Sequence, residues 1–153
     1  MTTPPASPSS VERSYHVSRD ADVAVVQAAA LHLAREIGFD KKGSWEFAIA
    51  ASEAATNIIK HAVEGEILLC TRGSCLELQA LDRGSGIDDV EAMLRDGHSE
   101  NRDLTEDEVI VGRRGLGLGL GAIKRLTDEL SIAPRPGGGT ALIARKYKEG
   151  SRR

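Results

Sequence analysis

Glu53 and Asn57 form the first pair in this 153-residue chain whose types and spacing could do chemistry. In a helix, residues four positions apart lie about 6 Å apart along the axis, on one face. There, a carboxylate can take a proton from a nucleophile, and a carboxamide can offer a neutral oxygen to a hard cation. The same pair is also found on solvated helix faces, so the spacing alone leaves both interpretations open.

A second candidate is the segment Asp82-Arg83-Gly84-Ser85-Gly86, which ends a hydrophobic stretch. An Asp at the end of a strand places a fixed hydrogen-bond acceptor beside glycines, where the backbone can pass close to a flat ligand. Such an acceptor suits an exocyclic amine. A tight turn built on the two glycines explains the segment equally well.

Residues 115–121 alternate glycine with leucine and open a predicted third helix. Backbone N–H groups at such a helix start can bind phosphate oxygens, and the helix dipole adds to the attraction. A P-loop is excluded because Lys124 comes three residues after Gly121. The spacing Gly117-x-Gly119-x-x-Ala122 formally matches a dinucleotide fingerprint, but the roughly 30 residues after it are too few for the rest of that domain. The ladder therefore indicates a nucleotide bound in some other fold.

The rest of the sequence predicts the elements that must position these residues. Apolar spacings of three and four indicate one helix over 20–37, followed by Gly38, and a second from an N-cap at Ser44 to about residue 62. The expected buried stripe of the second helix is Trp45, Ala48, Ile49, Ser52, Thr56 and Ile59. Predicted strands cover 13–17, 66–71, 75–82, 130–133 and 140–147, with turns at 72–74 and 135–139. This order predicts an α+β fold, a two-layer sandwich with a mostly antiparallel sheet and helices on one face.

Composition limits the classes of partner. The 20 Lys and Arg against 23 Asp and Glu give a net charge of −3, so there is no basic field for nucleic acid. No apolar run reaches the roughly 20 residues that a membrane helix needs, and residues 1–10 lack the features of a secretory signal. The two cysteines, Cys70 and Cys75, fit reduced thiols better than a disulfide framework or a zinc site. We expect a cytoplasmic protein with no nucleic acid or membrane partner and a disordered arm at residues 1–12.

Taken in order, the three segments resemble the N, G1 and G2 boxes of the GHKL ATPases, which share the Bergerat (histidine-kinase-like) ATP-binding fold. These boxes are Glu53-Ala54-Ala55-Thr56-Asn57, Asp82-x-Gly84-x-Gly86 and Gly115-x-Gly117-x-Gly119, and Gly138-Gly139-Thr140 resembles the last box. Residues 51–57, 95–97 and 117–126 resemble the bacterial anti-sigma-factor serine/threonine kinases, most closely the RsbT-type switch kinases of the stressosome. The resemblance implies a kinase domain over 13–148, an ATP lid at about 97–120 and a basic tail at 149–153.

The resemblance implies a role for each matching residue. Glu53 is expected to be the general base for a Ser or Thr hydroxyl, Asn57 to ligate Mg²⁺, and Asp82 to accept from the adenine amine of ATP. Thr140 is expected to support the adenine side, and Arg114 to lie near the γ-phosphate. The glycines expected to admit the nucleotide and line its triphosphate are Gly84, Gly86, Gly115, Gly117 and Gly119.

The implied function is an ATP- and Mg²⁺-dependent serine/threonine protein kinase that phosphorylates a STAS-domain antagonist protein in a bacterial partner-switching circuit of the sigma-factor or stress-response kind. In-line phosphoryl transfer needs positioning and charge neutralisation more than covalent help, which agrees with these residues. The alternative is an ATP-gated binding module that sequesters a sigma factor or activates a phosphatase.

Two features need separate interpretation. The lid departs from the family pattern because fifteen residues separate Ser99 from Gly115, several of them acidic, and we expect these to face solvent or a basic partner. His61 closes the second helix, and we expect it to serve in helix-end packing rather than as a phosphoacceptor.

Overall fold

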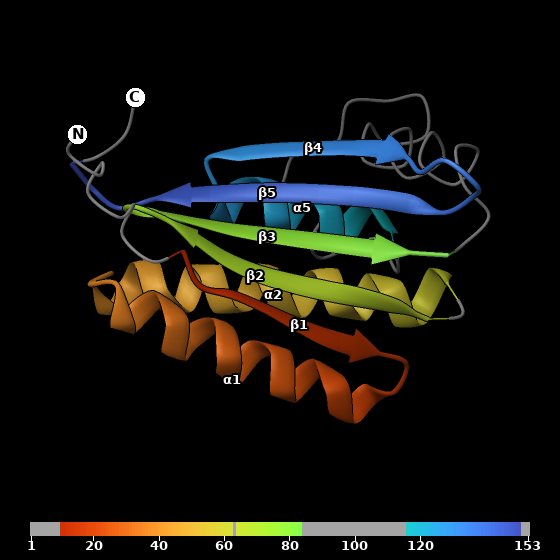
Figure 1. The fold of residues 1–153 in the computed structure, drawn as a ribbon, viewed down its shortest axis with the longest axis horizontal. Helices are drawn as coiled ribbons and strands as arrows, with labels where there is room; N and C mark the ends of the chain where they lie inside the picture. The colour runs from red at the N-terminus through yellow and green to blue at the C-terminus, as the bar shows by residue number, and fades with distance from the viewer. Residues whose placement is uncertain (1–9, 63, 84–115, 151–153) are drawn as a thin grey trace, which may run out of the picture.

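The computed structural model describes residues 10–62, 64–83 and 116–150, which form five strands and three helices. The helices are packed on one face of an antiparallel sheet (Figure 1), so the predicted two-layer α+β architecture is confirmed. The elements are β1 (Glu12–Val17), α1 (Asp20–Glu36), α2 (Lys41–His61), β2 (Gly65–Arg72), β3 (Cys75–Asp82), α5 (Leu116–Leu126), β4 (Glu129–Pro134) and β5 (Thr140–Tyr147). None of the described helices is long and apolar enough to span a bilayer.

The strand order in the sheet is β1-β2-β3-β5-β4, and every neighbouring pair is antiparallel. The predicted hairpin between β2 and β3 is confirmed: Arg72 pairs with Cys75, and Gly73 takes a positive φ of 64° in the turn. The last strand, β5, pairs with both β3 and β4. Because β3 and β5 are antiparallel, the end of β3 lies beside the start of β5, which brings Asp82 close to Thr140.

Helix α2 lies in the middle of the helical layer, with α1 on one side and α5 on the other (Figure 1). Its small buried residues allow close approach to the apolar face of the sheet, which includes Leu69, Leu78 and Ala144. The periodicity that predicted α1 is confirmed, since Val26, Ala30 and Leu33 are buried in the same core. The core therefore forms between one sheet face and the three helices.

The predicted start of α2 is wrong. The N-cap is Asp40, whose Oδ1 accepts a hydrogen bond from Gly43 N at 2.7 Å. Ser44 lies inside the first turn and is fully buried, and its hydroxyl donates to the carbonyl of Phe39 at 3.3 Å. Asp and Ser both cap helices well, so residue type alone did not exclude the prediction at Ser44.

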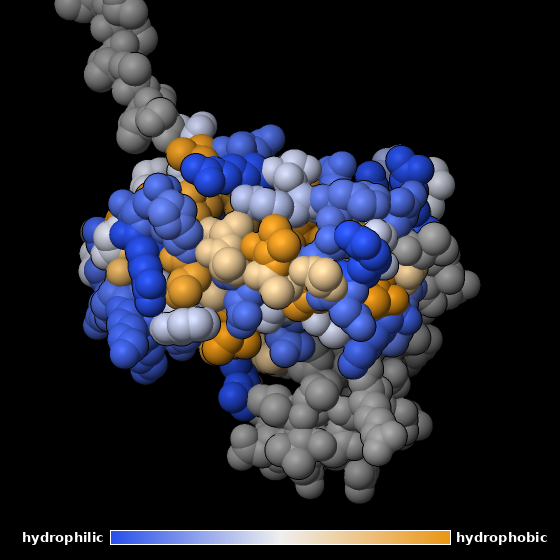
Figure 2. Space-filling model, turned by 90° about the horizontal axis from the view of Figure 1, so that it is seen from below, coloured by the Kyte–Doolittle hydropathy of each residue, from blue (hydrophilic) through white to orange (hydrophobic). Residues whose placement is uncertain are grey.

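The predicted buried stripe of α2 is also largely wrong. Trp45 is 40% exposed and Ile49 is 37% exposed, Ser52, Thr56 and Ile59 are half-buried, and Ala48 is the one member that is fully buried. The residues that face the core include four further alanines: Ala50, Ala51, Ala54 and Ala55. In the view from below toward α1, apolar surface occupies the middle of the face and hydrophilic surface surrounds it (Figure 2). The helix packs largely through small residues because it has neighbours on three sides, with Phe47 and Ile58 as its large buried side chains.

The sheet face opposite the helices carries a charged cluster around Glu77, which is only 1% exposed. Its carboxylate accepts from Arg145 Nε at 2.8 Å and from Gln79 Nε2 at 2.7 Å, and Arg72 Nε lies 3.5 Å away. Desolvation raises the pKa of Glu77, but these hydrogen bonds and the nearby guanidinium groups outweigh it and hold the pKa below its usual value. Glu77 therefore stabilises the folded chain in its ionised form.

Candidate nucleotide-binding site

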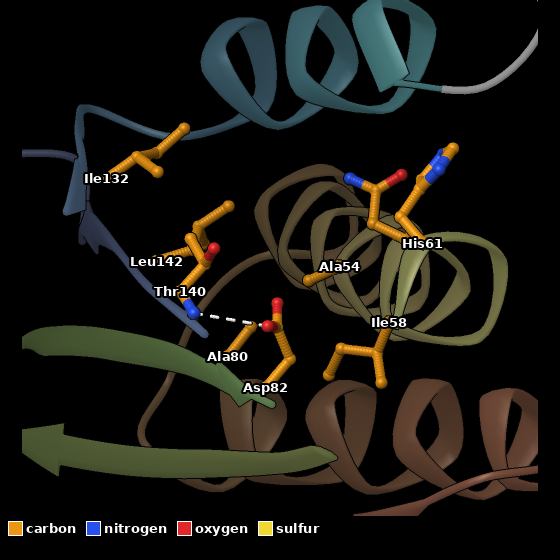
Figure 3. A pocket seen from close by; sticks show the side chains of 9 residues that line it. Ala54, Ile58, His61, Ala80, Asp82, Ile132, Thr140 and Leu142 are labelled. Atoms are coloured by element: carbon orange, nitrogen blue, oxygen red, sulfur yellow. Dashed lines mark hydrogen bonds between the residues drawn. The ribbon is translucent and has the colours of Figure 1, made fainter. Parts of the chain in front are cut away.

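A pocket opens at the end of the sheet where β3 finishes and β5 begins (Figure 3). The last turns of α2 form one wall, and the other wall consists of residues from β4, the end of β3 and the start of β5. Apolar side chains from both walls face the hollow, which suits a flat, mostly apolar ring system. The residues that line it are Ala54, Asn57, Ile58, His61, Ala80, Asp82, Ile132, Thr140 and Leu142.

Asp82 is held at both its side chain and its main chain. Thr140 N donates to Asp82 Oδ1 at 3.1 Å, and this bond is drawn in Figure 3. Arg135 Nη1 donates to the Asp82 carbonyl oxygen at 2.8 Å. Asp82 is therefore a positioned hydrogen-bond acceptor at the wall of an apolar pocket.

Gly139 explains why the chain can pass so close to Asp82. Its φ is +91°, a backbone conformation that residues other than glycine rarely adopt. A Cβ atom at this position would overlap the carbonyl oxygen of Asp82. Thr140, the next residue, is only 6% exposed and lines the pocket. The Gly139-Thr140 pair thus combines close backbone approach with a backbone donor to Asp82.

Asn57 is buried in the pocket wall rather than on a solvated helix face. It is 8% exposed, and its Nδ2 has no hydrogen-bond partner among the described residues. A buried amide without a partner is costly, so the position suits a group that meets a ligand. The carboxamide also fits a bound Mg²⁺, which prefers oxygen ligands, because a half-turn of the amide exchanges its oxygen and nitrogen.

Glu53 lies one helical turn before Asn57 and is half-buried, outside the residues that line the pocket. Burial raises the pKa of Glu53 above its usual value, and the positive charge of Lys60 partly opposes this shift. A carboxylate with a raised pKa is a better proton acceptor than an exposed one. The helix therefore places a carboxylate of raised pKa one turn before a carboxamide whose Nδ2 has no hydrogen-bond partner among the described residues.

From Leu116 onward, the glycine ladder lies inside a helix rather than in front of one. Gly117 and Gly119 belong to the first turn of α5, which starts at Leu116 and packs against α2. The first four N–H groups of a helix have no partner within it and can bind an anion. Four other expected nucleotide ligands lie outside the described residues: Gly84, Gly86, Arg114 and Gly115.

Sequence reasoning missed three features of this site. His61 does end α2 as expected, but it is half-buried and also lines the pocket. The four-residue spacing of Glu53, Asn57 and His61 on one helix face was a signal that could have found it. Ile132 and Arg135 come from the strand and turn before β5, and no local pattern pointed to either residue.

Comparisons with known proteins find related sequences. The serine/threonine-protein kinase RsbT of Bacillus subtilis is 32% identical over 130 residues, covering 82% of this chain and 89% of that protein. The anti-sigma F factor of Caldanaerobacter subterraneus is 33% identical over 103 residues, covering 64% of this chain and 66% of that protein.

The fold is also found in a solved structure. A chain in the crystal structure of the SiaB–SiaC complex from Pseudomonas aeruginosa matches with a TM-score of 0.59 and 15% identity, covering 89% of this chain and 88% of that one. Residues 17–146 match the histidine kinase-like ATPase domain, and this match includes Glu53, Asn57, Asp82 and Thr140. This chain therefore belongs to the histidine kinase-like ATPase domain family.

Proposed function

We propose that this chain is an ATP- and Mg²⁺-dependent serine/threonine protein kinase that phosphorylates a STAS-domain partner in a bacterial partner-switching circuit. The observation that carries the proposal is the buried Nδ2 of Asn57, which has no hydrogen-bond partner within the described part of the chain. It lies in a pocket that ends at Asp82, with Glu53 one turn away. The similarity of this chain to a serine/threonine-protein kinase, over most of both chains, supports protein phosphorylation as the activity. The site of action would be the cytoplasm, where ATP is available.

Each residue then has a defined task. Asp82 accepts from the amine of the base, and the apolar walls hold the ring between α2 and β5. Glu53 takes the proton of the incoming Ser or Thr hydroxyl, whose oxygen bonds to the γ-phosphorus as the bond to ADP breaks. A bound Mg²⁺, held through Asn57 and the phosphates, would neutralise charge on the leaving group.

The test is transfer of γ-labelled phosphate from ATP to proteins of the source cell. We expect an acid-stable labelled band with the wild type and none with Glu53→Gln. Glu36→Gln is the matched control, because Glu36 is exposed at the end of α1, and it should label as the wild type does. Labelling by Glu53→Gln would remove the base assignment while leaving the kinase activity.

A second candidate function is an ATP-gated binder, which the similarity to anti-sigma F factors supports. The nucleotide would then act as a conformational ligand, with or without phosphate transfer. Affinity capture with and without Mg-ATP separates the two. A sigma factor retained only with Mg-ATP favours the binder, and a small STAS-domain protein that becomes phosphorylated favours the kinase.

A further inference from the structure

The turn between β4 and β5 sends a guanidinium group to the far side of Asp82. Arg135 Nη1 donates to the Asp82 carbonyl oxygen at 2.8 Å, across 53 residues of sequence. Arg135 is half-buried, so this bond is partly shielded from water. A hydrogen bond from a charged donor in such a place is stronger than one between neutral groups.

This bond holds Asp82 where β5 no longer pairs with β3, whereas on the other side the pairing with β2 continues through Gly65 and Asp82. The pairing of β3 with β5 ends at Leu81 and Ala141, one residue before Asp82. Beyond that point, Thr140 N binds the Asp82 carboxylate and Arg135 binds its main chain. Arg135 and Thr140, at the two ends of one turn, therefore hold the main chain and the side chain of Asp82, respectively.

The turn is ordered well enough to act as a support. Arg135 N donates to Gly139 O at 3.0 Å, and Gly138 N donates to Arg135 O at 3.0 Å. Gly137, Gly138 and Gly139 have φ values of 88°, 111° and 91°, so this path needs glycine at three successive positions. The main chain of Arg135 is thus fixed relative to Thr140, and its side chain reaches Asp82 from a defined point.

We infer that Arg135 is a positioning residue for base selection: it holds Asp82 where the carboxylate accepts the 6-amino group of a purine and disfavours a 6-oxo group. The inference rests on the proposed function in that the pocket takes ATP. A carboxylate opposite a 6-oxo group meets a second acceptor, which is repulsive when the carboxylate cannot turn away. Arg135 restricts that escape because it ties down the main chain that carries Asp82.

The experiment compares ATP with ITP, which differs from ATP in carrying a 6-oxo group in place of the amine. Calorimetry gives Kd for Mg-ATP, Mg-ITP and Mg-tripolyphosphate, which has no base. We expect Arg135→Ala to weaken ATP binding about tenfold, the size that loss of one well-placed hydrogen bond allows. The ATP over ITP preference should fall by a similar factor, toward that of Asp82→Asn, while tripolyphosphate binding stays within about twofold.

Two variants control for charge and for folding. Arg83→Ala removes the same charge from an exposed neighbour of Asp82 and should change all three ligands by one common factor. Arg135→Lys keeps a charged donor and should recover part of the ATP preference. If Arg135→Ala fails to fold, Arg135→Lys decides the question, because its shorter donor should still lower the ATP over ITP preference below that of the wild type.

The outcomes are distinct. Equal weakening of ATP, ITP and tripolyphosphate by the Arg135 variants would overturn the inference and make Arg135 a general electrostatic residue. An unchanged ATP over ITP preference would also overturn it. If the wild type binds tripolyphosphate and ATP but does not label any protein, the kinase proposal fails while base selection by Arg135 stands. A wild type that binds no Mg-ATP removes both.

Discussion

Thr140 and Asp82 are 58 residues apart in sequence, and Thr140 N donates a hydrogen bond to Asp82 Oδ1 at 3.1 Å. The bond lies just past the last paired residues of β3 and β5, so it extends the contact between these strands into the pocket wall. The backbone at the start of β5 thus orients the group that is proposed to read the base. The base recognition that we propose for Asp82 and the closure of the sheet would then depend on the same few atoms.

Asn57 should trade stability for ligand binding. Asn57→Leu removes a buried amide whose Nδ2 has no partner among the described residues, and it keeps a similar volume. We expect the free energy of unfolding to rise by about 1 kcal/mol, seen as a higher urea midpoint, because no polar group is left unsatisfied. Mg-ATP binding should be lost in the same variant. A lower urea midpoint would mean that the amide is satisfied within the folded chain.

Glu53 should set the acid limb of the pH–rate profile. Burial raises the pKa of Glu53 above the 4.5 of a free glutamate. As the pH is lowered, Glu53 should therefore become protonated, and the transfer rate should fall, before the pH reaches 4.5. Lys60 lowers this pKa, so Lys60→Met should move the limb to higher pH. Lys41→Met, which removes an exposed lysine at the other end of α2, should leave the limb in place. A limb that ignores Lys60 would contradict the assignment of Glu53.

Glu77 should stabilise the fold only where it is ionised. Its pKa is lower in the folded chain than in the unfolded chain, so its contribution is complete above the unfolded value and is lost as the pH falls through the folded value. We expect Glu77→Gln to lower the free energy of unfolding by about 2 kcal/mol at pH 7. The difference from the wild type should shrink below pH 4. Glu66→Gln, an exposed change on the neighbouring strand, should have little effect at either pH.

Gly137 and Gly139 offer a matched comparison within one turn. Both have positive φ, but a Cβ at Gly137 meets open space, whereas at Gly139 it overlaps the Asp82 carbonyl. Gly137→Ala should cost about 1 kcal/mol of unfolding free energy, from backbone strain alone. Gly139→Ala should cost at least about twice that, and it alone should raise the KM for ATP. Equal effects on both quantities would show that the contact with Asp82 is unimportant.

Local patterns were sufficient for much of the fold. Alternating strands, the Gly73 turn and the apolar spacing of α1 are set by neighbours in sequence, and each was predicted from it. The buried face of α2 was not, because hydrophobicity ranks Trp45 and Ile49 above alanine. A helix with neighbours on three sides is instead selected for small residues such as Ala51 and Ala54.

The site divides in the same way. Asp82 and Asn57 were predicted as site residues because their residue types and spacing match a family pattern, and both line the pocket. The bond from Arg135 to Asp82 joins residues 53 positions apart, and such a pairing leaves no local signal in one sequence. Ile132 reaches the pocket for a similar reason, since the strand order that brings β4 to this end is a property of the whole chain.

The placement of β5 in the interior of the sheet has a consequence for folding order. Strands β1, β2 and β3 can pair with one another and pack against α1 and α2. The second neighbour of β3 is β5, which begins 58 residues after Asp82 and therefore joins later. Such long loop closures are slow compared with hairpin formation. A chain that folds on the ribosome would therefore form the β2–β3 hairpin early and complete the pocket only after residue 147 has emerged. Binding of the proposed nucleotide would then report that β5 has joined the sheet.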